Sequence, residues 1–82
     1  MDMRALKVGQ KVTLSGALPG AGITGKVIET AKGHVDVQVD RTDGEEPYFL
    51  VFNYDGNVTM FYECWWWVSQ GPIPDLKIVG AQ

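Results

Sequence analysis

The sequence predicts one small all-β domain of five to six short antiparallel strands, with little or no α-helix. Turn signals containing Gly or Pro recur along the chain, with β-branched segments between them. No window of ten or more residues keeps the 3.6-residue apolar period of a helix. The length of 82 residues is about half of the roughly 150 that are typical of a domain. Residues 1–82 are therefore expected to form a single domain with a thin core.

Three strands are expected in the first half of the chain, because apolar and polar residues alternate there. They cover Lys11–Leu14, Gly25–Thr30 and His34–Asp40. The third is the clearest, with three valines on one face and four polar residues on the other. The valine face is expected to lie in the core.

The turn at Ala31–Gly33 leaves one core position open. A two- or four-residue loop would place Ile28 on the valine face, whereas a three-residue loop with Gly33 in the left-handed region would place Val27 there. Both alternatives remain at this point.

A second hairpin is predicted by the Asp55-Gly56 pair, which lies between two apolar runs. This pair suits a two-residue type I′ turn, since both central residues of that turn have positive φ. Such a turn pairs Leu50 with Phe61. The second strand of this hairpin is predicted to continue without a break through the three tryptophans. After an irregular segment from Gly71, residues Asp75–Val79 are expected to form a short closing strand.

The order of these elements resembles an SH3-like small β-barrel, of the kind found in KOW and Tudor-like domains. The stretches that carry the resemblance are Val8–Leu14, the Gly22-x-x-Gly25-Lys26-Val27 segment, Val35–Asp40 and Pro74–Val79. The resemblance implies a barrel that binds peptides, RNA or other subunits. It transfers no functional residue, because the binding motifs of those families are missing here.

All nine aromatic residues lie between Tyr48 and Trp67. After the turn, the strand face that starts at Val58 carries no charge, whereas the other face carries Glu63, and an unpaired buried Glu is very costly. The uncharged face is therefore expected to be core. The predicted core comprises Val12, Leu14, Val35, Val37, Val39, Val51, Met60, Tyr62 and Trp66.

The opposite face of this hairpin is nearly as apolar, although a small domain has only one core to fill. Its residues are predicted to bind a partner or ligand: Tyr48, Leu50, Phe52, Tyr54, Phe61, Trp65 and Trp67. Aromatic residues are enriched in interface cores. The preferred hypothesis is a small non-catalytic module that forms a homo-oligomer through this face. A monomeric adaptor for peptides, an oligomeric enzyme with a site at the subunit junction, and burial of the face within the chain itself remain as alternatives.

Little in the sequence indicates catalysis or a cofactor. His34 is the only histidine and has no evident partner, and Cys64 is expected to be a buried, inert thiol. The acidic segment 40–46 does not have the spacing of a calcium-binding EF-hand loop. No metal or other cofactor is expected. The net charge of −3 disfavours nucleic acid, and no apolar run reaches the roughly 18 residues of a membrane span. A single cysteine suits the reducing cytoplasm.

Overall fold

The computed structural model describes the backbone of residues 2–63, 66–70 and 76–82, and the side chains of residues 2–61 and 76–82. Short β-strands dominate it, and its helical content is a single turn of 3₁₀ helix within these ranges. The elements are η1 (Met3–Ala5), β1 (Lys11–Leu14), β2 (Ala21–Ala31), β3 (His34–Arg41), β4 (Tyr48–Asn53), β5 (Val58–Glu63), β6 (Trp66–Gln70) and β7 (Ile78–Ala81). The predicted all-β class is confirmed.

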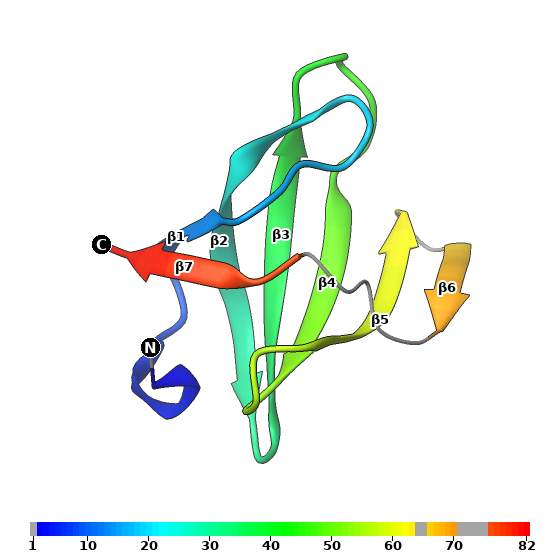
Figure 1. The fold of residues 1–82 in the computed structure, drawn as a ribbon. Helices are drawn as coiled ribbons and strands as arrows, with labels where there is room; N and C mark the ends of the chain where they lie inside the picture. The colour runs from blue at the N-terminus through cyan, green and yellow to red at the C-terminus, as the bar shows by residue number, and fades with distance from the viewer. Residues whose placement is uncertain (1, 64–65, 71–75) are drawn as a thin grey trace.

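The strands form one antiparallel sheet in the order β6-β5-β4-β3-β2-β1-β7. Four successive hairpin connections join β1 to β5, and β7 returns to pair with β1 (Figure 1). The expected closing strand is therefore present, although it begins at Ile78 rather than Asp75. The two edge strands, β6 and β7, do not pair with each other, so the sheet is open and the expected barrel closure is absent from it.

The β2–β3 turn resolves the choice between Val27 and Ile28. Ala31 pairs with His34, which leaves a two-residue turn whose Gly33 has a φ of +94°. A β-bulge between Val27 and Glu29 then shifts the register by one residue, so that Val27 pairs with Val37. Val27 is completely buried and Ile28 is only half-buried. The sequence-based prediction assumed that the length of the loop decides which residue faces the core. Because of the bulge, the loop length alone does not decide it.

The β4–β5 turn has one residue more than predicted. The N–H of Asn53 donates to the carbonyl of Asn57 at 2.9 Å, and the N–H of Gly56 donates to the carbonyl of Asn53 at 3.0 Å. Three residues therefore connect the paired asparagines, so the expected two-residue turn is wrong. The expected positive φ of Gly56 is confirmed, at +89°. A bulge between Val51 and Phe52 compensates for the extra residue, and Leu50 pairs with Phe61 as predicted.

Gly56→Val is expected to destabilise the protein by about 1–2 kcal/mol, because an L-residue pays that much in the left-handed region. No heavy atom lies within 4 Å of the position that a Cβ would take, so backbone strain is the cause rather than a clash. Asn57→Ser, next to it, should have a much smaller effect. Urea unfolding of both variants provides the measurement, and a neutral Gly56→Val would show that the turn has another conformation.

The core lies on the valine face of β3, as expected. Val12, Leu14, Val35, Val37 and Val39 are all buried, which confirms that part of the predicted core. The other members of the main core cluster are Met3, Leu6, Val27, Tyr48, Leu50, Phe52, Val58, Phe61, Leu76 and Ile78.

The face of the β4–β5 hairpin that packs on the core is the one that was predicted from the sequence to lie outside it. Leu50 and Phe52 are completely buried, and Phe61 is 9% exposed. Met60, expected in the core, is only half-buried, and Val51 is buried outside the main core cluster. The side chains of Tyr62 and Trp66, also expected in the core, lie outside the described residues.

Cross-strand pairing explains this reversal. Val37 of β3 pairs with Leu50 of β4, which pairs with Phe61 of β5. Directly paired residues share one face of a sheet, so the valine face dictates the core face of the hairpin. The prediction of a wet face is wrong for Phe61, which lies two residues before Glu63 on the same side of β5 and is 9% exposed, while the side chain of Glu63 lies outside the described residues. A second antiparallel strand, β6, starts at Trp66, so the expected continuous strand is divided.

Candidate functional site

The structure does not bring the predicted binding residues together on a surface. Tyr48, Leu50, Phe52 and Phe61 are buried within the chain. Trp65 lies outside the described residues, as does the side chain of Trp67. Tyr54 is half-buried in the β4–β5 turn, where its hydroxyl donates to the carbonyl of Ala31 at 3.0 Å.

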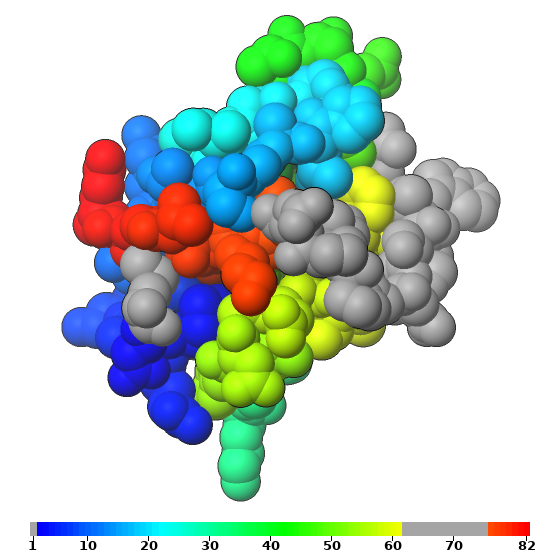
Figure 2. All heavy atoms as spheres, in the orientation of Figure 1, coloured from blue at the N-terminus to red at the C-terminus, as the bar shows by residue number. Residues whose placement is uncertain are grey.

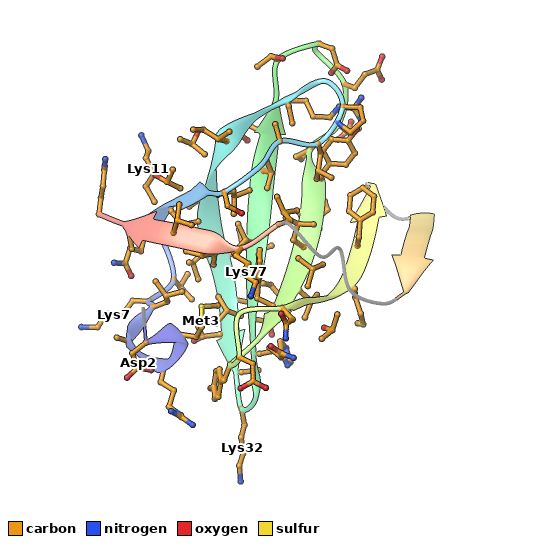
Figure 3. All side chains as sticks on the ribbon, in the orientation of Figure 1. Asp2, Met3, Lys7, Lys11, Lys32 and Lys77 are labelled. Atoms are coloured by element: carbon orange, nitrogen blue, oxygen red, sulfur yellow. The ribbon has the colours of Figure 1, made fainter. Side chains whose placement is uncertain are left out.

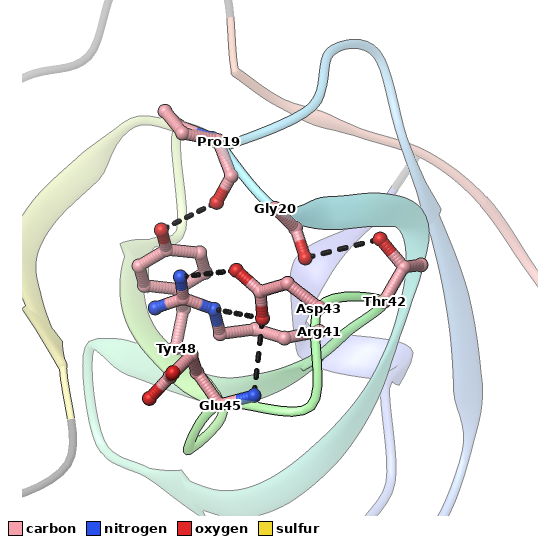
Figure 4. Close-up of polar contacts among 7 residues, drawn as sticks. All are labelled: Pro19, Gly20, Arg41, Thr42, Asp43, Glu45 and Tyr48. Carbon is pink, nitrogen blue, oxygen red and sulfur yellow. Dashed lines mark hydrogen bonds and ion pairs between the residues drawn. The ribbon is translucent and has the colours of Figure 1, made fainter.

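Tyr48 connects the core to two loops at one end of the sheet (Figure 4). Its hydroxyl donates to the carbonyl of Pro19 at 2.5 Å, and the guanidinium of Arg41 lies 4.3 Å from its ring centroid. The side chain of Arg41 in turn forms two hydrogen bonds with Asp43, at 3.1 and 2.7 Å. Tyr48 therefore contacts both the loop before β2 and the loop after β3, which is a structural role rather than exposure on a binding surface.

The β2 side of this cluster is fixed by Gly20. Its carbonyl accepts hydrogen bonds from the backbone N–H of Thr42, at 2.7 Å, and from the Thr42 hydroxyl, at 3.2 Å. The hydrogen bond from Arg41 and that from the N–H of Glu45 hold the pKa of Asp43 below its ordinary value. Asp43 of the acidic segment 40–46 is thus exposed but already bonded to Arg41 and to the backbone N–H of Glu45.

The outer side of the β4–β5 hairpin carries a different set of apolar residues from the predicted one. We call Phe49, Val51 and Met60 the hairpin outer face. Val51 pairs with Met60, and Phe49 lies two residues along β4 from Val51, on the same side of the strand. Since Tyr48, Leu50 and Phe52 fill the core side, β4 is apolar on both of its faces up to Asn53.

Polar side chains of β2 and β3 border the hairpin outer face. Asp36 pairs with Val51, and Glu29 pairs with Asp36, so the four strands carry the row Glu29, Asp36, Val51, Met60. Beside it, Lys26 pairs with Gln38, which pairs with Phe49. One half of this outer surface is therefore apolar, and the other half carries both signs of charge.

Asp36 is the most desolvated carboxylate of this surface. Its side chain is 13% exposed, and its Oδ1 atom lies 3.5 Å from Nε2 of His34, without a hydrogen bond. Burial raises the pKa of Asp36 above its ordinary value; the nearby His34 opposes this effect, and Glu29 adds to it. The folded protein thus holds an incompletely paired carboxylate beside Val51.

Asp36→Asn is expected to raise the free energy of unfolding near pH 7. A raised pKa means that the folded state binds the proton more tightly than the unfolded chain, so folding becomes less favourable as the pH rises above 3.8, up to the folded-state pKa. The advantage of the variant should be complete above the folded-state pKa and should vanish below about pH 3. Urea unfolding at several pH values measures it, with Asp40→Asn, an exposed site on the same strand, as the control. A variant that is less stable than wild type at neutral pH would contradict this expectation.

The described residues contain no cluster of three or more His, Cys, Asp or Glu side chains that could hold a metal ion. Within the same ranges, no helix is long and apolar enough to cross a membrane. No protein-family model, curated protein or solved structure matches the chain.

Proposed function

We propose that the protein is a small, non-catalytic binding module that forms a homo-oligomer through the hairpin outer face. The proposal keeps the self-association expected from the sequence and moves it to the opposite side of the β4–β5 hairpin. An SH3-like arrangement of the strands, curved around the single core, is part of the same proposal.

The observation that carries the proposal is the apolar character of β4 on both faces. An antiparallel strand with one solvated face normally alternates apolar and polar residues, as β3 does. On β4, Leu50 and Phe52 belong to the main core cluster, whereas Val51 is buried outside that cluster and Phe49 is half-buried. Met60 extends the same face onto β5. Phe49 and Met60 are only half-buried, and partly exposed apolar side chains that lie side by side are typical of an association surface.

A second copy of the chain suits this surface because its polar half carries opposite charges. In a two-fold contact the same patch meets itself, so Lys26 of one copy can approach Glu29 or Asp36 of the other while the apolar halves pack. Such pairing would also supply a cation to the incompletely paired carboxylate of Asp36. A stable dimer commonly buries about 800 Å² per partner, so the contact would include neighbouring residues as well as the three of the hairpin outer face.

Met60→Lys is expected to convert the oligomer into a folded monomer. Met60 is half-buried and outside the main core cluster, so a lysine there can reach water in the monomer, whereas a two-fold contact would enclose two ammonium groups. Size exclusion with light scattering gives the mass, and circular dichroism checks the fold. Val79→Lys, at an exposed position on β7 beyond β1 in the sheet, adds the same charge away from the hairpin and should leave the mass unchanged.

A wild-type chain that is monomeric at high micromolar concentration would contradict self-association. The monomeric peptide adaptor would then be favoured. An oligomer that Met60→Lys leaves intact would place the contact on another surface.

A further inference from the structure

A cavity of about 240 Å³ lies at the end of the sheet opposite the loop cluster of Tyr48. It lies where the N-terminal segment meets the β2–β3 and β4–β5 turns. Figure 2 shows these three parts together at the lower end of the molecule, with the N-terminal residues in blue beside the yellow-green β4–β5 turn. The residues that line it are Met3, Arg4, Leu6, Thr30, Ala31, Lys32, Val35 and Tyr54. None of them belongs to the hairpin outer face.

The floor of this cavity is apolar and rigid. Met3, Leu6 and Val35 are all members of the core cluster and are at most 6% exposed. Figure 3 shows Met3 pointing from η1 toward the sheet. An aromatic wall is added by Tyr54, whose ring is held in place because its hydroxyl donates to the carbonyl of Ala31. Four of the lining residues are thus held by core packing or by a hydrogen bond, and the exposed side chains of Arg4, Thr30 and Lys32 surround them.

The rim carries two positive charges and no negative one. Arg4 and Lys32 both line the cavity, and both are exposed. In the part of the chain that the structure describes, neither takes part in an ion pair. The guanidinium of Arg4 lies 5.2 Å from the centroid of the Tyr54 ring, so the positive charge is positioned above the aromatic wall. Two unpaired cations at one cavity stand out in a chain of net charge −3.

We propose that this cavity binds a small organic anion, with a carboxylate or phosphate group attached to an aromatic or short aliphatic body. The anionic group would lie between Arg4 and Lys32, since the guanidinium fork is suited to carboxylate and phosphate oxygens. The apolar body would lie on Met3, Leu6 and Val35, against the face of Tyr54. The volume is about eight times the roughly 30 Å³ that one water occupies in the liquid, which suits a single ring with its acidic group.

A titration followed by amide NMR tests this proposal on the full chain. The probes are phenyl phosphate and benzoate, with neutral benzamide and inorganic phosphate as matched controls. The two organic anions are expected to bind at millimolar concentration and to shift the amide signals of Thr30, Ala31 and Tyr54. Benzamide and inorganic phosphate should bind at least about tenfold more weakly, because each supplies only half of the interactions. Comparison of the two organic anions shows whether phosphate or carboxylate is preferred.

Two double variants separate a specific site from general charge attraction. Arg4→Gln with Lys32→Gln removes two positive charges from the cavity, whereas Lys11→Gln with Lys77→Gln removes two from exposed positions outside it. The first is expected to weaken binding at least about tenfold, and the second less than about twofold. All four residues are exposed, so both variants should fold.

Three results would overturn the proposal: no binding of either anion at millimolar concentration, equal binding of benzamide, or equal losses in the two double variants. Each differs from a failure of self-association, which is measured as a mass without any ligand.

Discussion

Phe52→Ala is expected to remove about 3–5 kcal/mol of folding free energy, the usual cost of truncating a fully buried phenylalanine. Phe52 is completely buried and is the largest of the fully buried side chains among the described residues. It packs in the strand row that joins Val35 of β3 to Val58 of β5. An 82-residue domain has on the order of 4–12 kcal/mol of stability in total, so the variant should lose about a quarter of it or more. Urea unfolding at low temperature would measure the loss.

Phe49→Ala provides the matched control, because it makes the same truncation on the opposite face of the same strand. Phe49 is half-buried and outside the main core cluster, so a loss of about 1 kcal/mol is expected, which is ordinary for a partly exposed position. The sequence interpretation ordered these two residues the other way, with Phe52 at the surface. Equal losses of stability in the two variants, or a larger loss for Phe49→Ala, would support the sequence-based assignment of Phe52 to the surface.

Local features of the fold could be predicted from the sequence because they depend on short-range rules. Alternation alone located β1 at its observed residues and β3 to within one residue of its end. The positive φ of Gly56 followed from its place in a turn between two apolar runs. The hairpin register at Leu50 and Phe61 was also predicted, since the two strands are joined by a short loop.

The face of the hairpin could not be predicted, because it depends on pairing across a long loop. Residues 42–47 connect β3 to β4 without a tight turn, so the sequence does not fix which residue of β4 lies opposite Val37. A one-residue shift at that point exchanges the two faces of β4 and, through it, those of β5. When both faces of a strand are apolar, its composition offers no independent check of which face is buried. The error therefore affected four of the predicted binding residues, Tyr48, Leu50, Phe52 and Phe61, which are buried.

The cavity of Arg4, Lys32 and Tyr54 was missed for a related reason. Its residues come from three segments that only the folded chain brings together, and no spacing in the sequence connects them. Tyr54 alone was selected, as one of the aromatic residues on the hairpin face that was predicted to bind a partner. A partial signal was present, because Lys32 and Tyr54 both lie at hairpin turns, and successive antiparallel hairpins place alternate turns at the same end of a sheet.

Gly25→Ala is expected to destabilise the protein by about 1–3 kcal/mol through overpacking, although it adds a single methyl group. Gly25 lies on β2 between Val12 of β1 and Val39 of β3, which are both buried. A Cβ at this position would lie 2.7 Å from a methyl carbon of Val37 and 2.9 Å from the carbonyl oxygen of Gln38. The carbonyl belongs to the backbone of a central strand, so it cannot move without disturbing its own strand pairing.

Gly22→Ala is the control for this prediction, since it makes the same change on the same strand. No heavy atom lies within 4 Å of the Cβ position at Gly22, and its stability should change by no more than about 0.5 kcal/mol. Thermal unfolding of the two variants measures the difference. If Gly25→Ala were as stable as Gly22→Ala, β2 and β3 could not approach each other as closely as the structure has them. The register that sets Val27 on Val37, and with it the face assignment of β2, would then have to be revised.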